Sequence, residues 1–403
     1  MKKQLIIISR LFSGLKETIA ESKWKPSGIP AFIKLAEEAK SYYDVTWVLV
    51  AKTKSESLIF DDYLKSKRIN CINFILIPYK NITHINRIDT LLNIFFSFFR
   101  FNRLLSKNND QVFYVDRSNI IIAAILKLFY KRCVVVRILG IYPDQNKITK
   151  NIFSKVYYFF EYISYKINYD LVIGTQDGSG TEYYITKLMN KKTKKEVLIN
   201  GTNKSQLHFQ ANNEKIKFLF IGTLVESKGI LELIQAFEKM VKFRGEIELK
   251  VIGKGPLEAN LKDQITKSKI DDYIKLLGHV SHSEINKYFQ ESDIYISLNK
   301  LGSLSNSVLE AISNGKCIFV LSQDTDKKID VFTHNEFFPS YSVVKIDRNN
   351  IVESLSKNVL YFLENKSEIK KYSKIMESIA EKKLRSWPER INKELEMIQD
   401  ISK

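Results

Sequence analysis

The chain has 403 residues, 44% of them hydrophobic, and a formal net charge of +18 at pH 7. The length fits two domains of ordinary size, and the hydrophobic content is ample for two buried cores. No apolar stretch approaches the ~18 residues needed to span a bilayer, so we do not expect a membrane-spanning protein. The net positive charge is compatible with binding to nucleic acid, anionic lipid or phosphorylated substrates. Because the charge is scattered and no recognised module is present, we do not expect nucleic acid as a partner.

The cysteines and histidines show no metal or disulfide pattern. Cys71, Cys133 and Cys317 are isolated, and each lies in or beside an apolar run. We expect buried, reduced thiols in a cytosolic protein. The histidines lack the spacing of metal ligands, so we expect neither a metal nor a cofactor.

The N-terminal half begins with a strand and a helix. The first apolar run ends at Arg10, which makes it too short for a signal peptide, and we expect the first strand of an α/β domain here. Gly28 precedes a predicted helix, and a second strand follows that helix. One face of the helix carries Phe32, Leu35, Ala36 and Ala39.

Three further segments each allow two interpretations. Residues 90–107 are densely aromatic and end with basic side chains, which fits a helix in lipid headgroups or a buried crossover helix. Residues 150–169 interleave tyrosines and lysines around an apolar stripe, as in a half-buried helix or a membrane rim. Residues 187–197 carry five lysines on a loop, which fits a solvated stretch or a site where anionic lipid is felt.

Residues 112–119, 134–143 and 170–180 each look like a strand followed by a polar turn, so we expect loops at the edge of a ligand cleft. From residue 217 to residue 321, short apolar runs alternate with helical segments about every 25 residues, which is typical of a parallel βαβ sheet. Ligands bind past the carboxyl ends of the strands in such sheets.

In the first of these βαβ units, a strand at 216–222 ends at a glycine, and a helix follows with its apolar face at Ile230, Leu233, Ile234 and Phe237. Lys228 and Gly229 therefore lie in the strand-to-helix turn, where free N–H groups and the helix dipole favour an anion. We expect Lys228 to meet phosphate.

The later units repeat this form. One helix begins at Leu257, and Ser281 with Glu284 predicts a capping box for the next. After a strand at 294–298 and a polar loop at 299–306, a short helix should have Asn306 or Ser307 as its N-cap and Gly315 past its end. The carboxylate of Glu310, about one turn in, could then reach hydroxyls of a ligand whose diphosphate docks on the amides of residues 306–308.

The order strand–G–x–L–x(3)–KG–helix, strand–G–x–GP, LLGHV and N–S–V–LEA–x(3)–G–K resembles the C-terminal donor domain, of the Glycos_transf_1 type, of retaining glycosyltransferase family 4. The resemblance implies the GT-B fold, with two Rossmann-like α/β domains that face each other across a cleft. It also implies that Lys228 binds the donor diphosphate, that Glu310 binds the ribose, and that His279 and Val280 pack on the base. Further donor-side positions implied by the match are Gly222, Thr223, Gly253, Ser305, Asn306 and Ser307.

On the N-terminal side, Gly28 matches the family's glycine loop, which faces the donor phosphates. A helix-capping turn without ligand contact explains Gly28 about equally well. Many members carry a histidine after the strand that matches 134–139; this chain has Gly140 there and Arg137 just before it, and both are acceptor-side candidates.

Two positions depart from the family pattern. Thr223 replaces the usual arginine, and Gly302 replaces the first glutamate of the E–x(7)–E pair. Either Ser303, Ser305 and Asn306 bind the donor sugar instead, or transfer is impaired; we favour substitution because the loop stays polar and flexible.

The resemblance sets the expected domains at 1–203 for the acceptor, 204–383 for the donor, and 384–403 for a helix that crosses back to the first domain with Trp387 as its buried anchor. The D–T–D at 324–326 is typical of a metal site in the other glycosyltransferase fold, but it follows a complete donor site, and GT-B enzymes need no metal there.

Taken together, the resemblance implies a metal-independent hexosyl- or related glycosyltransferase (EC 2.4). The expected donor is a UDP- or GDP-sugar, and the expected acceptor is a glycan hydroxyl, linked to a polyprenyl diphosphate, in bacterial surface polysaccharide synthesis. We expect a cytoplasmic location, peripheral at an anionic inner membrane face. The alternatives are a catalytically impaired GT-B paralogue that acts as a binding partner in a membrane complex, and an epimerase of the same fold, for which no extra acid/base residues are evident.

Overall fold

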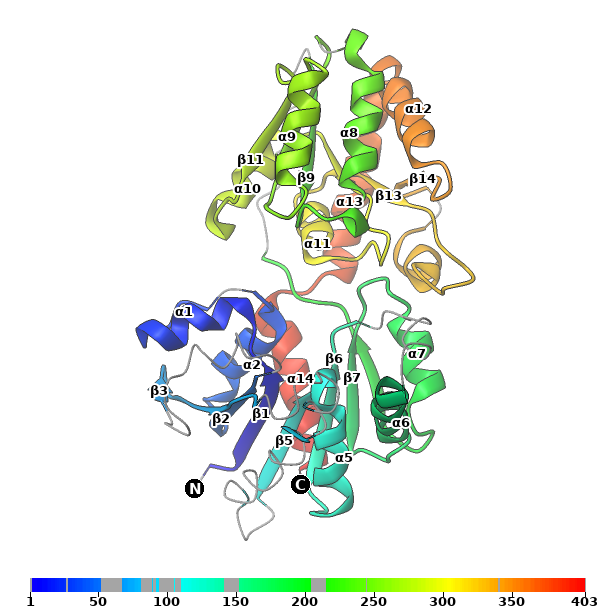
Figure 1. Cartoon of the computed structure of the whole chain (residues 1–403). Helices are drawn as coiled ribbons and strands as arrows, with labels where there is room; N and C mark the ends of the chain where they lie inside the picture. The colour runs from blue at the N-terminus through cyan, green and yellow to red at the C-terminus, as the bar shows by residue number, and fades with distance from the viewer. Residues whose placement is uncertain are drawn as a thin grey trace. The chain divides into compact units, whose positions relative to one another are not determined.

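The computed structural model describes residues 2–26, 28–51, 67–80, 89, 92–93, 105, 110–140, 152–203, 215–243, 245–339 and 341–402. Its chain forms two compact units (Figure 1). Unit 1 comprises Met1–Thr175, Thr181–Leu198 and Trp387–Lys403, and unit 2 comprises Gln176–Gly180 and Ile199–Ser386. The expected domain boundaries at 203/204 and 383/384 stay predictions, and the aromatic segment 90–107 lies almost wholly outside the described residues.

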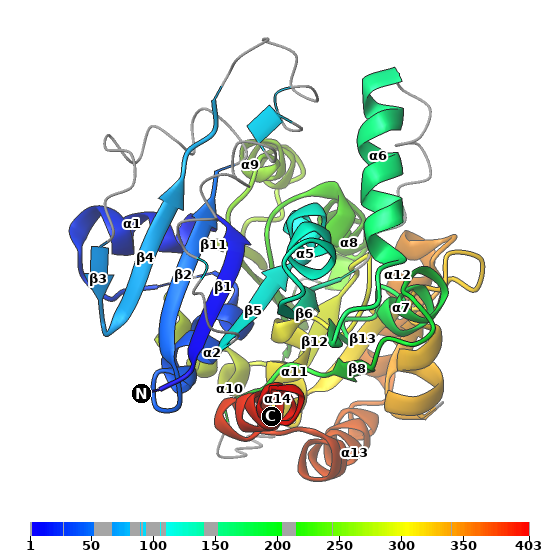
Figure 2. The same ribbon diagram turned by 90° about the horizontal axis from the view of Figure 1, so that it is seen from below.

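Unit 1 is built on a parallel sheet of eight strands in the order β3-β4-β2-β1-β5-β6-β7-β8, in which only β3 runs antiparallel to its neighbour (Figure 2). The strands are β1 (Gln4–Arg10), β2 (Asp44–Val50), β3 (Lys67–Ile69), β4 (Ile72–Ile77), β5 (Gln111–Asp116), β6 (Cys133–Ile138), β7 (Leu171–Thr175) and β8 (Lys195–Leu198). The first strand begins where the short apolar run predicted it.

Helices cover both faces of this sheet. Alternate side chains of β1 point to opposite faces, so Leu5 and Ile7 lie in one core and Ile6 and Ile8 in the other. The first core contains side chains of α1 (Ser13–Glu21), α2 (Pro30–Ala39) and α14 (Trp387–Ile401). The second contains side chains of α5 (Ile120–Leu128), α6 (Ile152–Tyr165) and α7 (Thr181–Leu188).

Unit 2 has a fully parallel six-stranded sheet in the order β11-β10-β9-β12-β13-β14. Its strands are β9 (Ile216–Ile221), β10 (Ile247–Ile252), β11 (Ile274–Gly278), β12 (Ile294–Ser297), β13 (Cys317–Leu321) and β14 (Val344–Ile346). The chain moves outward from β9 to β11 and then returns to place β12 on the other side of β9. The strand order therefore reverses between β9 and β12.

Helices again form two layers. One core contains side chains of α8 (Ile230–Lys239), α9 (Glu258–Lys267) and α12 (Ile351–Glu364), and α8 and α12 pack side by side. The other contains side chains of α10 (His282–Glu291), α11 (Asn306–Ser313) and α13 (Ser367–Lys383). The predicted apolar face of α8 is buried as expected. Both units thus have the predicted α/β architecture of a parallel sheet between helices.

Two local expectations were wrong. The Ser281 hydroxyl donates to the Glu284 carboxylate and does not cap α10, because the two side chains satisfy each other at the exposed helix end. Of the cysteines, only Cys317 is buried; Cys133 is half-buried, and Cys71 is exposed in the turn between β3 and β4. Within the described ranges, no helix is long and apolar enough to cross a bilayer.

The C-terminal helix α14 packs on α2 of unit 1, which confirms the predicted return of the chain to the first domain (Figure 2). Trp387 at its start is only 9% exposed, so the predicted anchor is buried. Its inner face also carries charge: Glu394 is fully buried, accepts a hydrogen bond from the Tyr114 hydroxyl, and forms an ion pair with Arg390. The Nε of buried Arg137 lies 3.6 Å from Oε1 of Glu394.

This charge cluster predicts a strong dependence of stability on Glu394. Glu394→Gln leaves two buried guanidinium groups without their carboxylate, and we expect a loss of about 3–5 kcal/mol in the free energy of unfolding. Urea denaturation measures the loss. Glu396→Gln, an exposed site on the same helix, is the matched control and should change the free energy by less than about 0.5 kcal/mol. Equal, small effects from both variants would contradict the structural role of the cluster.

Candidate functional site

The reversal of strand order in unit 2 marks where a ligand is expected. In open α/β sheets, ligands bind outside the carboxyl ends of the strands at such a point. Lys228 follows the end of β9, and Glu310 lies on α11, which follows the end of β12. The two residues most strongly implicated by the sequence therefore come from the two strands that flank the switch point.

Glycines form the floor of this site. Gly222, Gly253 and Gly278 stand at the ends of three neighbouring strands. The Gly222 N–H donates to the Ile252 carbonyl (3.0 Å), and the Gly253 N–H donates to the Gly278 carbonyl (2.8 Å). A Cβ on Gly253, whose φ is +142°, would lie 1.9 Å from the Gly222 carbonyl oxygen. Because side chains are excluded here, a ligand can approach the bare backbone.

The Lys228 turn is held rigidly beside this floor. Residues Glu226–Lys228 form a 3-10 turn, and Gly229, at φ +69°, begins α8. A Cβ on Gly229 would lie 2.5 Å from Cβ of Leu298, and the Lys300 N–H donates to the Ser227 carbonyl (2.8 Å). The turn after β9 is therefore packed against the loop after β12. Its lysine side chain extends past Gly222, because a Cβ there would be 4.0 Å from Lys228 Cδ.

The Lys228 ammonium is a half-buried cation. Burial lowers the pKa of Lys228, and the nearby negative charge of Asp177 raises it. Within the described part of the chain, the ammonium makes no hydrogen bond and no ion pair inside 4.0 Å. An anion at this position would restore the interactions that burial removes.

Helix α11 begins one residue earlier than predicted. Ser305 is the N-cap, not Asn306 or Ser307, and its side chain makes no capping hydrogen bond. The Ser305 and Ser307 hydroxyls lie 3.1 Å apart, and the side-chain oxygen Oδ1 of Asn306 accepts from the side-chain amide of Asn200 (2.8 Å). The helix therefore begins without a side-chain acceptor for its first N–H groups, which leaves them available to an anion.

Glu310 and the segment after β11 meet on the other side of the helix start. Oε1 of Glu310 lies 3.7 Å from Nε2 of His282, and the Glu310 side chain is 22% exposed. Burial raises the pKa of Glu310, while the charge of protonated His282 lowers it. His279 is exposed and Val280 half-buried just before His282. These residues together can contact the hydroxyls and flat ring of a ligand.

The loop after β12 differs from the sequence-based expectation. Ser303 was expected to be free for a sugar, but it is fully buried, and both its N–H and its hydroxyl donate to Oδ1 of Asp330 (each 2.8 Å). Burial raises the pKa of Asp330 to about 7. Gly302 has φ +142°, and a Cβ there would lie 2.6 Å from the Asp177 carbonyl oxygen. The backbone of residues 177–179 thus occupies the space that a larger residue at 302 would need.

The N-terminal candidates belong to unit 1. Gly28 lies before α2 at φ +102°, and a Cβ added there would lie 3.7 Å from the backbone nitrogen of Gly14. Gly140 follows β6 and is buried. The structure contradicts the prediction that Arg137 contacts the acceptor substrate. Its side chain is fully buried and donates to the carbonyls of Ile138 and Ile173 and to the Thr175 hydroxyl. A guanidinium enclosed in this way cannot contact an acceptor substrate.

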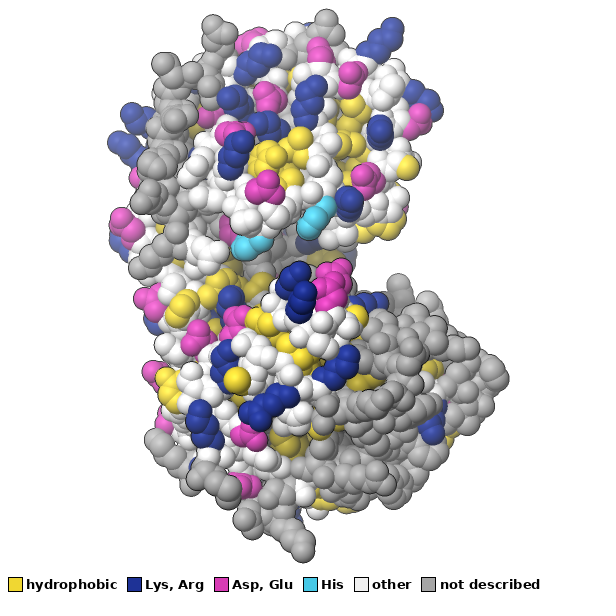
Figure 3. Space-filling model, turned by 90° about the vertical axis from the view of Figure 1, so that its left-hand side faces the viewer, with side chains coloured by type: hydrophobic (Ala, Val, Ile, Leu, Met, Phe, Trp, Pro, Cys, Tyr) yellow, Lys and Arg dark blue, Asp and Glu magenta, His cyan; other side chains and the backbone are white. Residues whose placement is uncertain are grey.

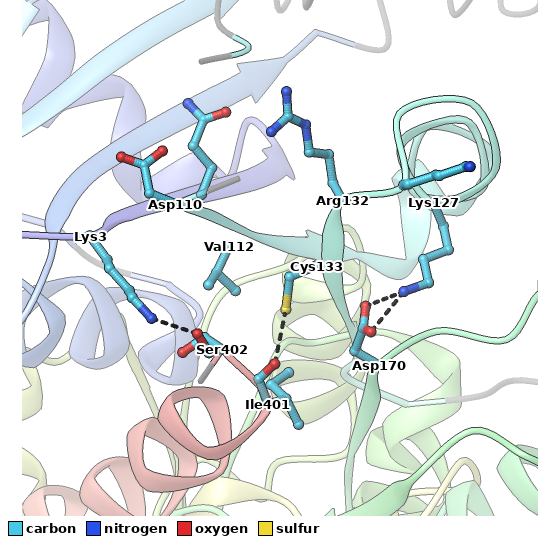
Figure 4. A pocket seen from close by; sticks show the side chains of 11 residues that line it. Lys3, Asp110, Val112, Lys127, Arg132, Cys133, Asp170, Ile401 and Ser402 are labelled. Atoms are coloured by element: carbon cyan, nitrogen blue, oxygen red, sulfur yellow. Dashed lines mark hydrogen bonds and ion pairs between the residues drawn. The ribbon is translucent and has the colours of Figure 1, made fainter. Parts of the chain in front are cut away.

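A pocket of about 250 Å³ in unit 1 is a different feature (Figure 4). It is lined by Lys3, Asp110, Lys127, Arg132, Cys133 and Asp170, among others. Apart from Lys127, which lies on α5, these residues stand at or just before the amino ends of the strands, the edge opposite to that where ligands bind in parallel sheets. Lys127 also donates to both carboxylate oxygens of Asp170 (2.7 Å each), so its charge is already paired.

The D–T–D segment does not gather into a metal site. Oδ1 of Asp324 accepts from the Lys327 backbone N–H (2.9 Å), and Asp324 and Ile329 form a β-bridge that closes a tight turn. In the ranges that the structure describes, no group of three or more His, Cys, Asp or Glu side chains could hold a metal ion.

Three residues at the site were missed by the sequence analysis: His282, Asn200 and Asp177. His282 could have been considered, since it lies three residues after His279 in the segment expected to face the base. Nothing local in the sequence indicates that Asn200 or Asp177 contacts loops more than 100 residues away.

The close packing at Gly302 makes a test possible. Gly302→Ala should lower the free energy of unfolding by about 2–5 kcal/mol, from backbone strain at positive φ together with a clash against backbone atoms. Gly302→Glu should be at least as harmful. The control is Gly245→Ala, where an added Cβ meets nothing within 4 Å. Denaturation by urea provides the comparison, and a Gly302→Ala variant as stable as the Gly245→Ala variant would refute the packing argument.

Comparisons with known proteins agree with this architecture. Residues 203–382 match the family model described as "Glycosyl transferases group 1". The amylovoran biosynthesis glycosyltransferase AmsK of Erwinia amylovora is 34% identical over 86 residues, 21% of each chain. The alpha-monoglucosyldiacylglycerol synthase of Acholeplasma laidlawii is 25% identical over 153 residues, 36% of this chain and 38% of the relative. The matched segments span 21% to 46% of the first three curated relatives.

A solved structure extends the likeness to the whole chain. The crystal structure of Anabaena Alr3699/HepE in complex with UDP superposes with a TM-score of 0.68 at 12% identity, covering 98% of this chain and 100% of that one. At this identity the likeness concerns the fold. Residues 203–382 therefore belong to the glycosyl transferases group 1 family, and the chain has the GT-B fold.

Proposed function

We propose that this protein is a glycosyltransferase that moves a sugar from a nucleoside diphosphate sugar to a hydroxyl of an acceptor glycan, with retention of configuration. The observation that carries the proposal is the surroundings of Lys228. This cation is half-buried, lacks an ion-pair partner among the described residues, and lies over a glycine floor at the switch point of the sheet. A donor diphosphate fits the charge and the bare backbone.

The geometry suggests a role for each donor-side residue. The diphosphate would bind Lys228 and the uncapped N-terminus of α11, with the backbone of Gly222, Thr223 and Gly253 beneath it. The Glu310 carboxylate would accept hydrogen bonds from the ribose hydroxyls.

The base and the sugar would lie on either side of these phosphates. His279 and Val280 would flank the base, and Ser305, Asn306 and Ser307 would offer polar groups near the phosphates. In unit 1, Gly28 remains a donor-side candidate and Gly140 an acceptor-side candidate.

Catalysis would then rest on charge. As the bond from the anomeric carbon to the diphosphate breaks, negative charge grows on the leaving oxygen, and a fixed ammonium with oriented N–H groups stabilises it. This requires no metal ion. Retention would follow from attack by the acceptor hydroxyl on the face that the diphosphate leaves, without a protein nucleophile.

The donor is proposed to be a UDP- or GDP-sugar, and the solved relatives favour UDP. Structures of Anabaena Alr3699/HepE are described in complex with UDP and with UDP-glucose. AmsK is described as an enzyme of amylovoran biosynthesis. These likenesses support a place in bacterial polysaccharide synthesis.

The acceptor is proposed to be lipid-linked, such as a glycan on polyprenyl diphosphate, at the cytoplasmic face of the membrane. Helix α6 supports this with a row of exposed apolar side chains: Val156, Phe159, Phe160, Tyr162 and Ile163. Phe159 is 59% exposed, and the Lys166 ammonium lies 5.2 Å from the centre of the Tyr162 ring. Exposed aromatic residues beside lysines suit the interface of an anionic bilayer.

Nucleic acid is not proposed as a partner. On the face of the protein in Figure 3, Lys and Arg side chains are interspersed with Asp and Glu side chains and do not form one continuous patch. A nucleic-acid interface requires basic side chains that follow a phosphate backbone.

A second candidate, a catalytically impaired paralogue that acts as a binding partner in a membrane complex, is favoured by Thr223 and Gly302. The Thr223 side chain is exposed, and it supplies no second cation for the diphosphate.

Nucleotide binding provides the first test. In a thermal-shift panel of UDP, GDP, CMP and ADP sugars, we expect one nucleotide family to raise the melting temperature of the wild type. Lys228→Ala should weaken that binding by about 10- to 100-fold, as expected for a charged hydrogen bond. Lys262→Ala, at an exposed site on α9, is the matched control and should bind like the wild type.

The outcomes separate the candidates. Binding that is lost in the Lys228→Ala variant, together with sugar transfer or slow hydrolysis, supports the enzyme. Binding without turnover supports the impaired paralogue. No shift with any sugar nucleotide contradicts the donor site itself.

Membrane association is tested separately. The double change Phe159→Ser and Phe160→Ser should reduce co-sedimentation with phosphatidylglycerol vesicles at least several-fold, because it removes apolar side chains that insert at the interface. Tyr361→Ser, at a 48% exposed site on unit 2, is the control. If the α6 variant sediments with vesicles as well as the control does, helix α6 is not the membrane contact.

A further inference from the structure

The segment Gln176–Gly180 follows β7 of unit 1 in the chain but is built into unit 2. The Asp177 carbonyl accepts from the Leu304 N–H (3.1 Å), and the Gly178 carbonyl accepts from the Asp330 N–H (2.7 Å). A short stretch of an otherwise N-terminal region is thus bonded to the loop after β12 and to the buried Asp330.

Glycines make this contact unusually close. A Cβ on Gly178 would lie 2.1 Å from Oδ1 of Asp330, and one on Gly180 would lie 2.5 Å from the Lys328 carbonyl. On the opposing side, Gly302 leaves room for the backbone of Asp177. Contacts of this kind require glycine on both sides. The 176–180 segment is therefore packed tightly against the loop after β12, and this packing determines the position of Asp177.

The Asp177 carboxylate is fixed in turn. Its Oδ1 accepts from the backbone N–H (3.0 Å) and the hydroxyl (2.6 Å) of Ser179. The side chain is half-buried, and its charge is felt at Lys228 and at Asp330. A held carboxylate therefore stands within electrostatic range of the cation proposed to bind the donor diphosphate.

We propose that Asp177 is a specificity-determining residue that accepts hydrogen bonds from hydroxyls of the donor sugar. The inference rests on the proposed function. Position 302, in the loop after β12, is a glycine and offers no side chain to a ligand. We infer that Asp177, on the 176–180 segment, supplies a carboxylate to the site in its place.

The chemistry of a sugar nucleotide supports this role. The sugar is attached directly to the diphosphate, so its ring hydroxyls lie close to any group that binds the phosphates. Hydroxyls are hydrogen-bond donors, and an ionised carboxylate is the strongest acceptor among side chains. Ser303, the nearest serine on the opposing loop, is occupied by Asp330 and cannot serve. Asp177 is an acidic side chain that this packing holds within electrostatic range of Lys228.

Asp177 has two other conceivable roles, which a substitution separates. As a simple counter-ion of Lys228, it would oppose the binding of every diphosphate, with or without a sugar. As a purely structural group, it would affect stability and not ligand preference. Only a contact with the sugar changes the affinity for a sugar nucleotide relative to that for its free nucleoside diphosphate.

The experiment measures dissociation constants by isothermal titration for wild type, Asp177→Asn and Asp271→Asn. The probes are UDP with UDP-glucose, UDP-galactose and UDP-N-acetylglucosamine, and GDP with GDP-mannose. Asn keeps the Oδ1 acceptor that holds the Ser179 N–H, so the loop should be retained. Asp271→Asn makes the same change at an exposed aspartate of unit 2 and is the matched control.

The expected result is a ratio between the two dissociation constants, sugar nucleotide over free nucleotide, that rises about 10- to 100-fold in Asp177→Asn and stays within a few-fold of wild type in Asp271→Asn. If Asp177→Asn does not fold, Asp177→Ala provides the same ratio. A ratio unchanged in the substituted protein overturns the inference while leaving the proposed function intact. A wild type that binds neither free nor sugar-linked nucleotide overturns both.

Discussion

The exclusion of side chains from the carboxyl ends of β9, β10 and β11 is the constraint on which the candidate site depends. Gly253 approaches Gly222 so closely that a single methyl group would collide with its carbonyl oxygen. Because the floor is bare backbone, the Lys228 side chain can extend across it, and there is space for a phosphate to approach the ammonium. Close packing excludes a side chain in the same way at Gly229, where α8 begins against Leu298, and at Gly302.

Charge in unit 2 is arranged around this floor by loops from distant parts of the chain. Lys228 carries its charge in a half-buried setting that lowers its pKa, and Asp177 partly offsets the effect. Without a ligand, this is a costly arrangement for a structural lysine, since burial of a charge without a bonded partner is unfavourable. The diphosphate proposed above would pair with this charge and make the same arrangement favourable. The site would then be formed before its ligand binds.

Unit 1 uses buried charge differently. Arg137 and Arg390 share the carboxylate of Glu394 inside the contact between α14 and the sheet, and the Tyr114 hydroxyl donates to the same carboxylate. The buried guanidinium groups here join the C-terminal helix to the sheet of unit 1. Unit 1 also exposes apolar side chains: several aromatic residues of α6 are in contact with solvent.

The sequence by itself determined the two parallel α/β sheets, the apolar face of α8, the place of Lys228 and Gly229 in the turn after β9, and the buried Trp387, because periodicity and turn chemistry are local. It predicted the position of Glu310 near a helix start to within one residue of the cap. Only the tertiary structure decided that Arg137 is enclosed, that Ser303 is bonded to Asp330, and that Asp177 lies within electrostatic range of Lys228. Each depends on contacts between residues about 30 to 260 positions apart in the chain, and no local pattern encodes which loop will fill the space that a glycine leaves open.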